Sequence, residues 1–248
     1  MIRLVIFDLD GTLWRGNEPI QGAAESLSEL RRKSVQIRFL TNNSSISSEE
    51  VARKLTGMGF EANRHEVMGS GPFSAQVCQS RGMRSVYVVG GPALEREFSS
   101  FDKAGADADA VVVGIDRGFT YDKCSRALQL IRRGARFIAT NRDATYPLEG
   151  GRVEPGAGAI VAAIEAASGV APEVLGKPNP AMINQLLDEA GVEPGDCLVV
   201  GDRMETDIAA GQAAGCQTAL VLTGATIDPV SGVRVAVSVP DLLSTPFD

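Results

Sequence analysis

The chain has 248 residues, of which 44% are hydrophobic and 22% are charged, so it can bury the core of one large domain or two modest ones. No apolar run approaches the ~20 residues of a membrane-spanning helix, and the N-terminus does not resemble a signal peptide. The net charge of −7 disfavours nucleic acid and anionic membrane surfaces as partners, because both require a basic face.

The cysteines and the histidine indicate the state of the thiols and the kind of metal site to expect. The four cysteines, Cys78, Cys124, Cys197 and Cys216, form no Cys-x-x-Cys pair. We therefore expect buried, reduced thiols and a cytoplasmic protein. A zinc site is not expected, since His65 is the only histidine.

The first strand is predicted from an apolar run that ends at two carboxylates, Asp8 and Asp10. Residues two apart on a strand share a face, and Gly11 then lets the backbone turn away. Two crowded carboxylates repel each other unless a cation or a proton lies between them, and Mg²⁺ suits such oxygen ligands. The alternative is that both aspartates only form the turn that closes the strand.

Hydrophobic periodicity predicts the elements that follow. Strands are expected at residues 35–41, 86–89, 110–114, 137–140, 196–202, 218–222 and 235–238, with a short element near 67–68. Helices are expected at residues 23–33, 48–55, 72–81, 93–98, 121–133, 158–167, 181–190 and 205–214. This alternation predicts an α/β protein with a doubly wound parallel sheet.

A second series of alternating predicted strands and helices begins near residue 83. We therefore predict a discontinuous core of residues 1–82 and 174–248, with an inserted α/β domain at 83–173.

Polar residues lie at or just past several predicted strand ends, where open parallel sheets bind their ligands. They are Asp8 with Asp10, Thr41 with Asn42, Lys177, and Asp202 with Asp207. Carboxylates for a metal, an ammonium and loop amides are what phosphoryl transfer through a carboxylate nucleophile requires. Taken singly, these residues could be helix caps, turn residues or surface charges.

The same residues, in the same order, resemble the four motifs of the haloacid dehalogenase superfamily. Thr41 follows Asp8 by 33 positions, which leaves no room for a domain, whereas Lys177 follows Thr41 by 136 positions. An insertion in the second gap resembles the large-cap phosphatases of the NagD-like and p-nitrophenyl-phosphatase-like subfamily. Residues 139–145 and 154–158 resemble that subfamily as well.

Chemistry and resemblance together suggest roles for the two N-terminal aspartates. Asp8 is expected to attack phosphorus and form an aspartyl-phosphate. Asp10 is expected to protonate the leaving oxygen and then activate water. The resemblance implies that Mg²⁺ is bound by the Asp8 carboxylate, the Asp10 backbone carbonyl and the Asp202 carboxylate.

The remaining roles concern the phosphate group. The Thr41 hydroxyl, the Asn42 backbone and the Lys177 ammonium are expected to bind it. Asp207 is expected to orient a metal-bound water or Lys177. Within the inserted domain, Asn141 and Asp143 are candidates for substrate contact, as is Arg117, although roles in folding the loops explain them equally well. Trp14 could lie at the mouth of the site or fill the core.

We therefore expect a Mg²⁺-dependent hydrolase of small phosphomonoesters, such as a sugar, nucleotide or cofactor phosphate. The alternatives are a regulatory protein that binds a phosphorylated metabolite with little turnover, and a phosphotransferase or mutase of the same superfamily. A dehalogenase is disfavoured, because that chemistry has no use for an acid at Asp10. A small phosphorylated metabolite is the expected partner, and a homodimer formed through the inserted domain is also expected.

Overall fold

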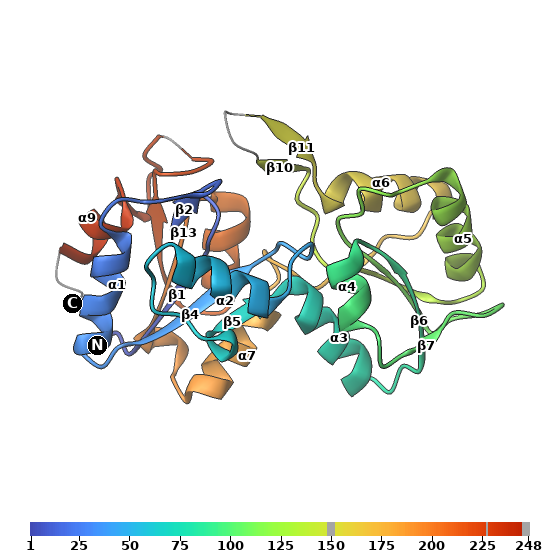
Figure 1. Ribbon diagram of the computed structural model, residues 1–248, viewed down its shortest axis with the longest axis horizontal. Coiled ribbons are helices and arrows are strands. Elements are labelled where there is room, and N and C mark those ends of the chain that lie inside the picture. Colours follow the sequence, from blue (N-terminus) through green and yellow to red (C-terminus); the bar gives the residue numbers. More distant parts are fainter. Residues whose placement is uncertain (148–151, 227, 245–248) are drawn as a thin grey trace. The chain divides into compact units, whose positions relative to one another are not determined.

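The computed structural model describes residues 1–147, 152–226 and 228–244, which form two compact units (Figure 1). The first unit comprises Met1–Thr41, Ser48–Met68 and Lys177–Asp248, and the second comprises Asn42–Ser47 and Gly69–Gly176. Each unit is built on a parallel sheet with helices, which confirms the predicted α/β fold class.

The first unit contains the beginning of the chain and the described residues from Lys177 onward. Its strands are β1 (Leu4–Phe7), β2 (Trp14–Arg15), β3 (Glu18–Pro19), β4 (Gln36–Thr41), β13 (Cys197–Gly201), β14 (Gln217–Val221) and β15 (Arg234–Ala236), with β5 (Val67–Gly69) at its border. Its helices are α1 (Ala23–Arg32), α2 (Ser48–Gly57), α7 (Ala181–Ala190), α8 (Ala209–Ala213) and α9 (Val239–Ser244). Short 3-10 turns at Arg64–Glu66 and Pro194–Asp196 and a π-helical turn at Met204–Ile208 complete it.

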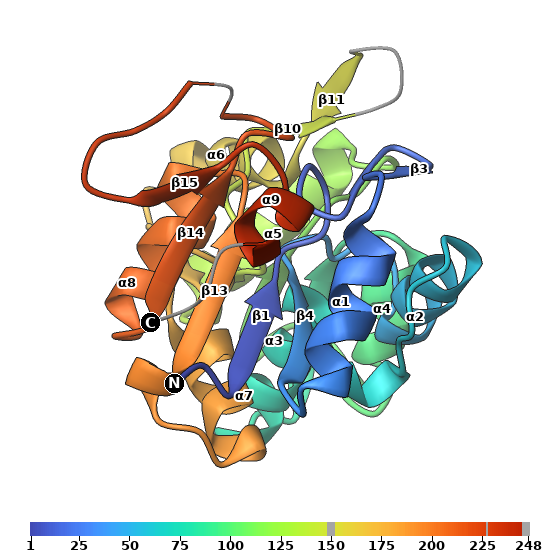
Figure 2. The same ribbon diagram turned by 90° about the vertical axis from the view of Figure 1, so that its left-hand side faces the viewer.

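The main sheet of this unit has the order β15-β14-β13-β1-β4-β5, with β1 between β13 and β4 (Figure 2). All four β1 residues are buried, as expected of a central strand that is covered on both faces. Helices α1 and α9 cover one face, and α7 and α8 lie on the other (Figures 1 and 2). Phe7 pairs with Val200 of β13 and with Phe39 of β4, so these three parallel strands end at the same edge of the sheet.

The second unit is formed by the middle of the chain. Its strands are β6 (Ser85–Val89), β7 (Asp102–Lys103), β8 (Ala110–Val113), β9 (Arg136–Ala139), β10 (Thr145–Pro147), β11 (Val153–Pro155) and β12 (Glu173–Val174). Its helices are α3 (Ser70–Ser80), α4 (Pro92–Glu97), α5 (Tyr121–Arg132) and α6 (Ala157–Ser168). The five-stranded sheet has the order β12-β9-β8-β6-β7, and every pair in it is parallel.

Alternate residues of the second sheet form one hydrophobic core with α5 and α6. The buried cluster contains Val89, Val111, Val113, Ala127, Leu130, Ile131, Ala135, Phe137, Ala139, Ile160, Val161 and Ile164. Because residues two apart on a strand share a face, this pattern follows directly from the alternation in β8 and β9.

The main segment of the second unit begins at Gly69, so it includes helix α3, whereas the inserted domain at 83–173 stays a prediction. Helix α3 belongs to the second unit because it packs against α4, where Gly71 faces Leu94. Near its end, Arg81 forms a bidentate ion pair with Glu173 of β12, at 2.6 Å for each bond. An apolar helix face at 72–81 fits either sheet, so its periodicity alone does not assign it to a unit.

Several elements were not predicted. The two-residue strands of the β2–β3 hairpin are too short to produce a periodicity, and the β10–β11 hairpin and α9 were also missed. The helix predicted at 205–214 begins instead as the π-helical turn before α8.

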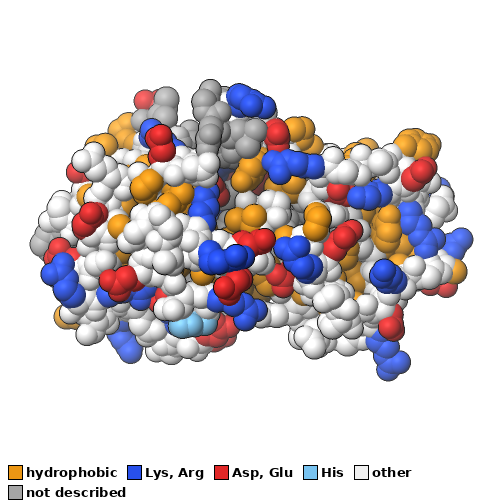
Figure 3. All heavy atoms as spheres, in the orientation of Figure 1, with side chains coloured by type: hydrophobic (Ala, Val, Ile, Leu, Met, Phe, Trp, Pro, Cys, Tyr) orange, Lys and Arg blue, Asp and Glu red, His pale blue; other side chains and the backbone are white. Residues whose placement is uncertain are grey.

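The state of the cysteines, the lengths of the helices and the surface charges relate to the expectations from composition. All four cysteines are free, and three are buried while Cys124 is half-buried. Within residues 1–147, 152–226 and 228–244, no helix has both the length and the apolar character needed to span a bilayer. On the face drawn in Figure 3, acidic and basic side chains are interspersed.

We predict that the free energy of unfolding depends on pH through Glu66, which is 5% exposed. Burial alone would raise the pKa of Glu66, but hydrogen bonds from Arg31 (2.7 and 3.1 Å) and from the Asn63 backbone (2.9 Å) lower it below 4.5. A lowered pKa means that the stabilisation is present above pH 4.5 and is lost as the pH falls through the folded-state value.

Glu66→Gln should therefore lower the free energy of unfolding by about 1–3 kcal/mol at pH 7, measured by chemical denaturation. The difference from wild type should shrink below pH 4.5. Glu18→Gln, at an exposed position, is the control. An equal loss at pH 7 and pH 3.5 would contradict the ion-pair explanation.

Candidate active site

Asp8 lies one residue beyond β1 and contacts a buried lysine. The Lys177 ammonium donates to Asp8 Oδ1 at 2.5 Å, and the side chains of Lys177 and Asp8 are 3% and 12% exposed. The Asp8 backbone N–H donates to Val200 of β13 at 2.8 Å, and the Thr12 hydroxyl donates to Asp8 Oδ2 at 3.4 Å. The carboxylate is therefore fixed at the strand end with one oxygen against a cation.

Lys177 also contacts Asp207, which lies in the π-helical turn after β13. The ammonium donates to Asp207 Oδ1 at 2.7 Å, and the Asp207 side chain is 2% exposed. The backbone N–H of Arg203 donates to the other Asp207 oxygen at 3.0 Å. Asp207 thus orients the lysine that faces Asp8.

Asp202 directly follows β13 and is 2% exposed. Its Oδ2 accepts the Ala225 N–H at 2.5 Å, and its backbone carbonyl accepts the Thr226 N–H at 3.1 Å. A Cβ added to Gly11 would lie 2.5 Å from Asp202 Oδ2, and a Cβ added to Gly224 would overlap the same oxygen. Two glycines therefore make room for this carboxylate.

The carboxylates of Asp8, Asp202 and Asp207 form one acidic cluster. Their ligand oxygens lie within 4.8 Å of one another, and this is the one such group found among the described residues. Burial and the negative charge of Asp207 raise the pKa of Asp8 well above its usual value and that of Asp202 to about 7, although Lys177 opposes both shifts. A hard divalent cation with oxygen ligands fits this set, because it would offset the repulsion.

The surroundings of Lys177 favour the charged form of its ammonium despite the burial of the side chain. Burial disfavours its charged form, but the charges of Asp207 and Asp8 and their hydrogen bonds outweigh that effect and raise the pKa of Lys177 above its usual value.

Asp10 lies outside this cluster of carboxylates. Its Oδ1 accepts the indole N–H of Trp14 at 2.8 Å. Trp14 is 1% exposed, so its ring is part of the core while its polar atom faces Asp10.

Two of the three residues predicted to bind phosphate, Thr41 and Asn42, lie on either side of a unit border. Thr41 ends β4 in the first unit and is 4% exposed, whereas Asn42 begins a segment of the second unit. In the second unit, the Asn42 carbonyl accepts hydrogen bonds from Asn141 Nδ2 at 2.7 Å and from the Ser70 hydroxyl at 2.6 Å. Asn42 Nδ2 donates to Asp143 Oδ1 at 3.2 Å.

The candidates for substrate contact in the second unit therefore form hydrogen bonds or ion pairs with neighbouring residues. Asn141 is 1% exposed and, like Asp143, bonds to Asn42. Arg117 forms an ion pair with Glu154 at 2.6 Å. Arg117 and Glu154 line a pocket of about 490 Å³ within this unit, together with Ile115, Asp116, Phe119, Tyr146, Pro155, Ala159 and Ile160.

Two parts of the site were missed in the sequence. The loop at residues 223–225 binds Asp202 through a backbone N–H, and its only sequence signal is Gly224, three residues after the end of β14. The hydrogen bond from Trp14 to Asp10 carries no signal, because an indole four residues from a carboxylate can point either way.

Comparisons with known proteins find similarity to hydrolases and phosphatases. The family model described as haloacid dehalogenase-like hydrolase matches residues 5–103, and a HAD-hydrolase-like model matches residues 174–239. The acid sugar phosphatase of Staphylococcus saprophyticus is 38% identical, covering 89% of this chain and 86% of the relative. The 5'-nucleotidase YutF of Bacillus subtilis is 39% identical, covering 89% and 87%. The crystal structure of 4-nitrophenylphosphatase from Thermotoga maritima has a TM-score of 0.91 and 34% identity, covering 98% of this chain and 97% of that one.

We predict that Gly224→Ala weakens the binding of a divalent cation, because the added methyl group displaces the Asp202 carboxylate. The affinity for Mg²⁺, measured by isothermal titration calorimetry, should fall about ten- to a hundredfold. Gly195→Ala is the matched control, since nothing lies within 4 Å of its added Cβ. Unchanged affinity in Gly224→Ala would show that Asp202 does not bind the cation.

Proposed function

We propose that this chain, which belongs to the haloacid dehalogenase-like hydrolases, cleaves small phosphomonoesters with Mg²⁺ through an aspartyl-phosphate on Asp8. That the protein is a phosphatase follows from its family and its relatives. The mechanism rests mainly on one observation: Lys177 donates to both Asp8 and Asp207 beside the Asp202 carboxylate.

The first half-reaction transfers the phosphoryl group to Asp8. A carboxylate oxygen of Asp8 attacks phosphorus, and the bond between phosphorus and the leaving oxygen breaks. Asp10 donates its proton to that oxygen, so that an alcohol departs. The Lys177 ammonium, 2.5 Å from Asp8, stabilises negative charge on the transferring group.

The second half-reaction regenerates the enzyme. Asp10, now ionised, takes a proton from water, and the water attacks the phosphorus of the aspartyl-phosphate. The bond between phosphorus and the Asp8 oxygen breaks, which releases inorganic phosphate and the free carboxylate. The Thr41 hydroxyl and the Asn42 backbone N–H are proposed to bind phosphate oxygens in both halves.

Asp8, Asp202 and the Asp10 backbone carbonyl are proposed to bind Mg²⁺. The cation would neutralise the repulsion between the phosphate and the Asp8 carboxylate. The raised pKa values of Asp8 and Asp202 support this assignment, because two buried carboxylates gain from a shared cation.

The proposed substrates are small phosphomonoesters, such as sugar, nucleotide or cofactor phosphates. The printed names of two relatives, an acid sugar phosphatase and a 5'-nucleotidase, support this class without choosing within it. Four further points stay predictions. They are substrate contacts by Asn141 and Asp143, a cytoplasmic location, a homodimer, and the exclusion of nucleic acid and membranes as partners. A regulatory protein with little turnover and a phosphotransferase or mutase remain the alternatives.

We predict that Asp8→Asn lowers kcat by about four orders of magnitude or more, because an amide cannot attack phosphorus. Release of inorganic phosphate from a panel of phosphorylated metabolites is the measurement. Acid-quenched protein should carry a labelled phosphoryl group on Asp8 in wild type and none in the variant. Asp188→Asn, at an exposed position of α7, is the control. Wild-type activity in Asp8→Asn would contradict the mechanism.

We also predict that removal of divalent cations abolishes turnover reversibly. Dialysis against EDTA should reduce phosphate release to background, and Mg²⁺ should restore it, because the carboxylate cluster otherwise repels the substrate. Full activity after dialysis against EDTA would exclude a role for a divalent cation in turnover. Folded protein that releases no phosphate from any compound, with Mg²⁺ present, would favour the regulatory alternative.

A further inference from the structure

We propose that Trp14 is a positioning residue for Asp10, in which the indole N–H occupies one carboxylate oxygen and so directs the other toward the leaving group. This inference rests on the proposed role of Asp10 as acid and base. It concerns the first unit alone, in which every residue of the argument lies.

The contact between Trp14 and Asp10 is held by the backbone as well as by side chains. The indole Nε1 lies 2.8 Å from Asp10 Oδ1. The Gly11 N–H donates to the Trp14 carbonyl at 2.7 Å, and the Trp14 N–H donates to the Leu9 carbonyl at 3.3 Å. Asp10 and Trp14 also form an isolated bridge. The tight loop therefore fixes the distance between the two side chains.

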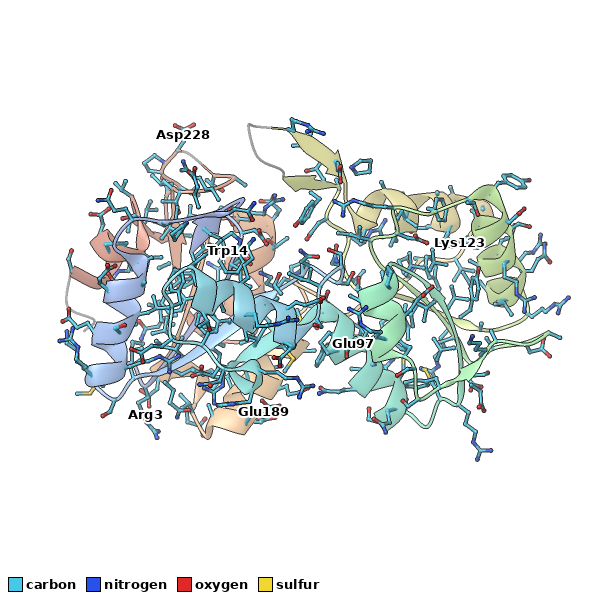
Figure 4. All side chains as sticks on the ribbon, viewed as in Figure 1. Arg3, Trp14, Glu97, Lys123, Glu189 and Asp228 are labelled. Carbon is cyan, nitrogen blue, oxygen red and sulfur yellow. The ribbon has the colours of Figure 1, made fainter. Side chains whose placement is uncertain are left out.

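The indole ring is anchored from a second element. Lys54 of α2 places its ammonium 4.4 Å from the centroid of the Trp14 ring, and it donates to the Gly16 carbonyl at 2.8 Å. Figure 4 labels Trp14 beside α2. A cation over the face of an indole is attracted by the ring, so Lys54 restrains both the ring and the turn after β2.

The same strand also reaches the loop that binds Asp202. Arg15, the residue after Trp14, donates through Nε to the Thr223 carbonyl, and the Thr223 hydroxyl donates to the Gly11 carbonyl at 2.6 Å. Strand β2 is thus linked on one side to Asp10 and on the other to the Asp202 loop.

The consequence for the reaction follows from hydrogen-bond geometry. An indole N–H only donates, so it can bond to Oδ1 whether Asp10 is ionised or protonated. Oδ2 is then the oxygen that carries the proton to the leaving group and later receives one from water. Without the indole N–H, the carboxyl group can rotate, and proton transfer then starts from a less favourable geometry.

The experiment removes the hydrogen bond and keeps the shape of the side chain. Trp14 is the only tryptophan, so the isostere 3-benzothienylalanine, which has sulfur in place of the N–H, can be placed at this position alone. The values of kcat/KM are measured with 4-nitrophenyl phosphate and phenyl phosphate. Phenolate is the poorer leaving group, so its departure depends more on the acid.

We expect kcat/KM for phenyl phosphate to fall about tenfold more than kcat/KM for 4-nitrophenyl phosphate. Lys54→Met should show the same selectivity with a smaller loss, together with a change in the fluorescence of the single tryptophan. Lys33→Met, at an exposed position of the first unit, should leave kcat/KM for both substrates and the tryptophan fluorescence unchanged.

Asp10→Asn separates this inference from the function on which it rests. If Asp10→Asn loses phenyl phosphate activity selectively but the isostere loses both substrates equally or neither, Trp14 does not position Asp10. If Asp10→Asn keeps wild-type activity on both substrates, the proposed role of Asp10 itself is wrong. Selective loss in both proteins supports the positioning role.

Discussion

The Lys177 ammonium donates to two carboxylates, Asp8 and Asp207, and the geometry of the proposed catalytic cluster depends on these two contacts. With Asp202 included, one positive charge faces three carboxylates, of which Asp202 and Asp207 are buried and Asp8 is 12% exposed. Charges away from water interact far more strongly than they do in solvent. The cluster of three carboxylates and one ammonium therefore has an unfavourable excess of negative charge. In the proposed mechanism, a divalent cation would offset this excess of negative charge and so reduce the repulsion between Asp8 and an incoming phosphoryl group.

The fold brings these residues together from distant parts of the chain. Strand β1 supplies Asp8, its neighbour β13 leads to Asp202 and Asp207, and Lys177 begins the segment that returns from the second unit. Parallel strands place their carboxyl ends at one edge, which is why these residues meet there. The chain also passes between the units directly after Thr41 and directly before Lys177. Three of the proposed site residues, Thr41, Asn42 and Lys177, therefore lie at the unit borders.

The sequence predicts the parts of the site that follow from strand ends and spacing. The candidates Asp8, Asp10, Lys177, Asp202 and Asp207 are predicted because they lie at or just past predicted strand ends and because their motifs resemble a known family. The β2–β3 hairpin could not be predicted, because strands of two residues have no period. The loop that closes on Asp202 and the indole bond to Asp10 depend on side-chain directions that exist only after the chain has folded. The unit border near residue 69 depends on which sheet a helix packs against, and an amphipathic pattern does not specify that.

The most direct test of the central claim is a crystal structure of the protein with Mg²⁺ and beryllium trifluoride, which mimics a phosphoryl group on a carboxylate. The account predicts that beryllium is bonded to an Asp8 oxygen, with Mg²⁺ bound by the Asp8 and Asp202 carboxylates and Lys177 beside the fluorides. Beryllium fluoride on another residue, or Mg²⁺ bound away from Asp8 and Asp202, would contradict it.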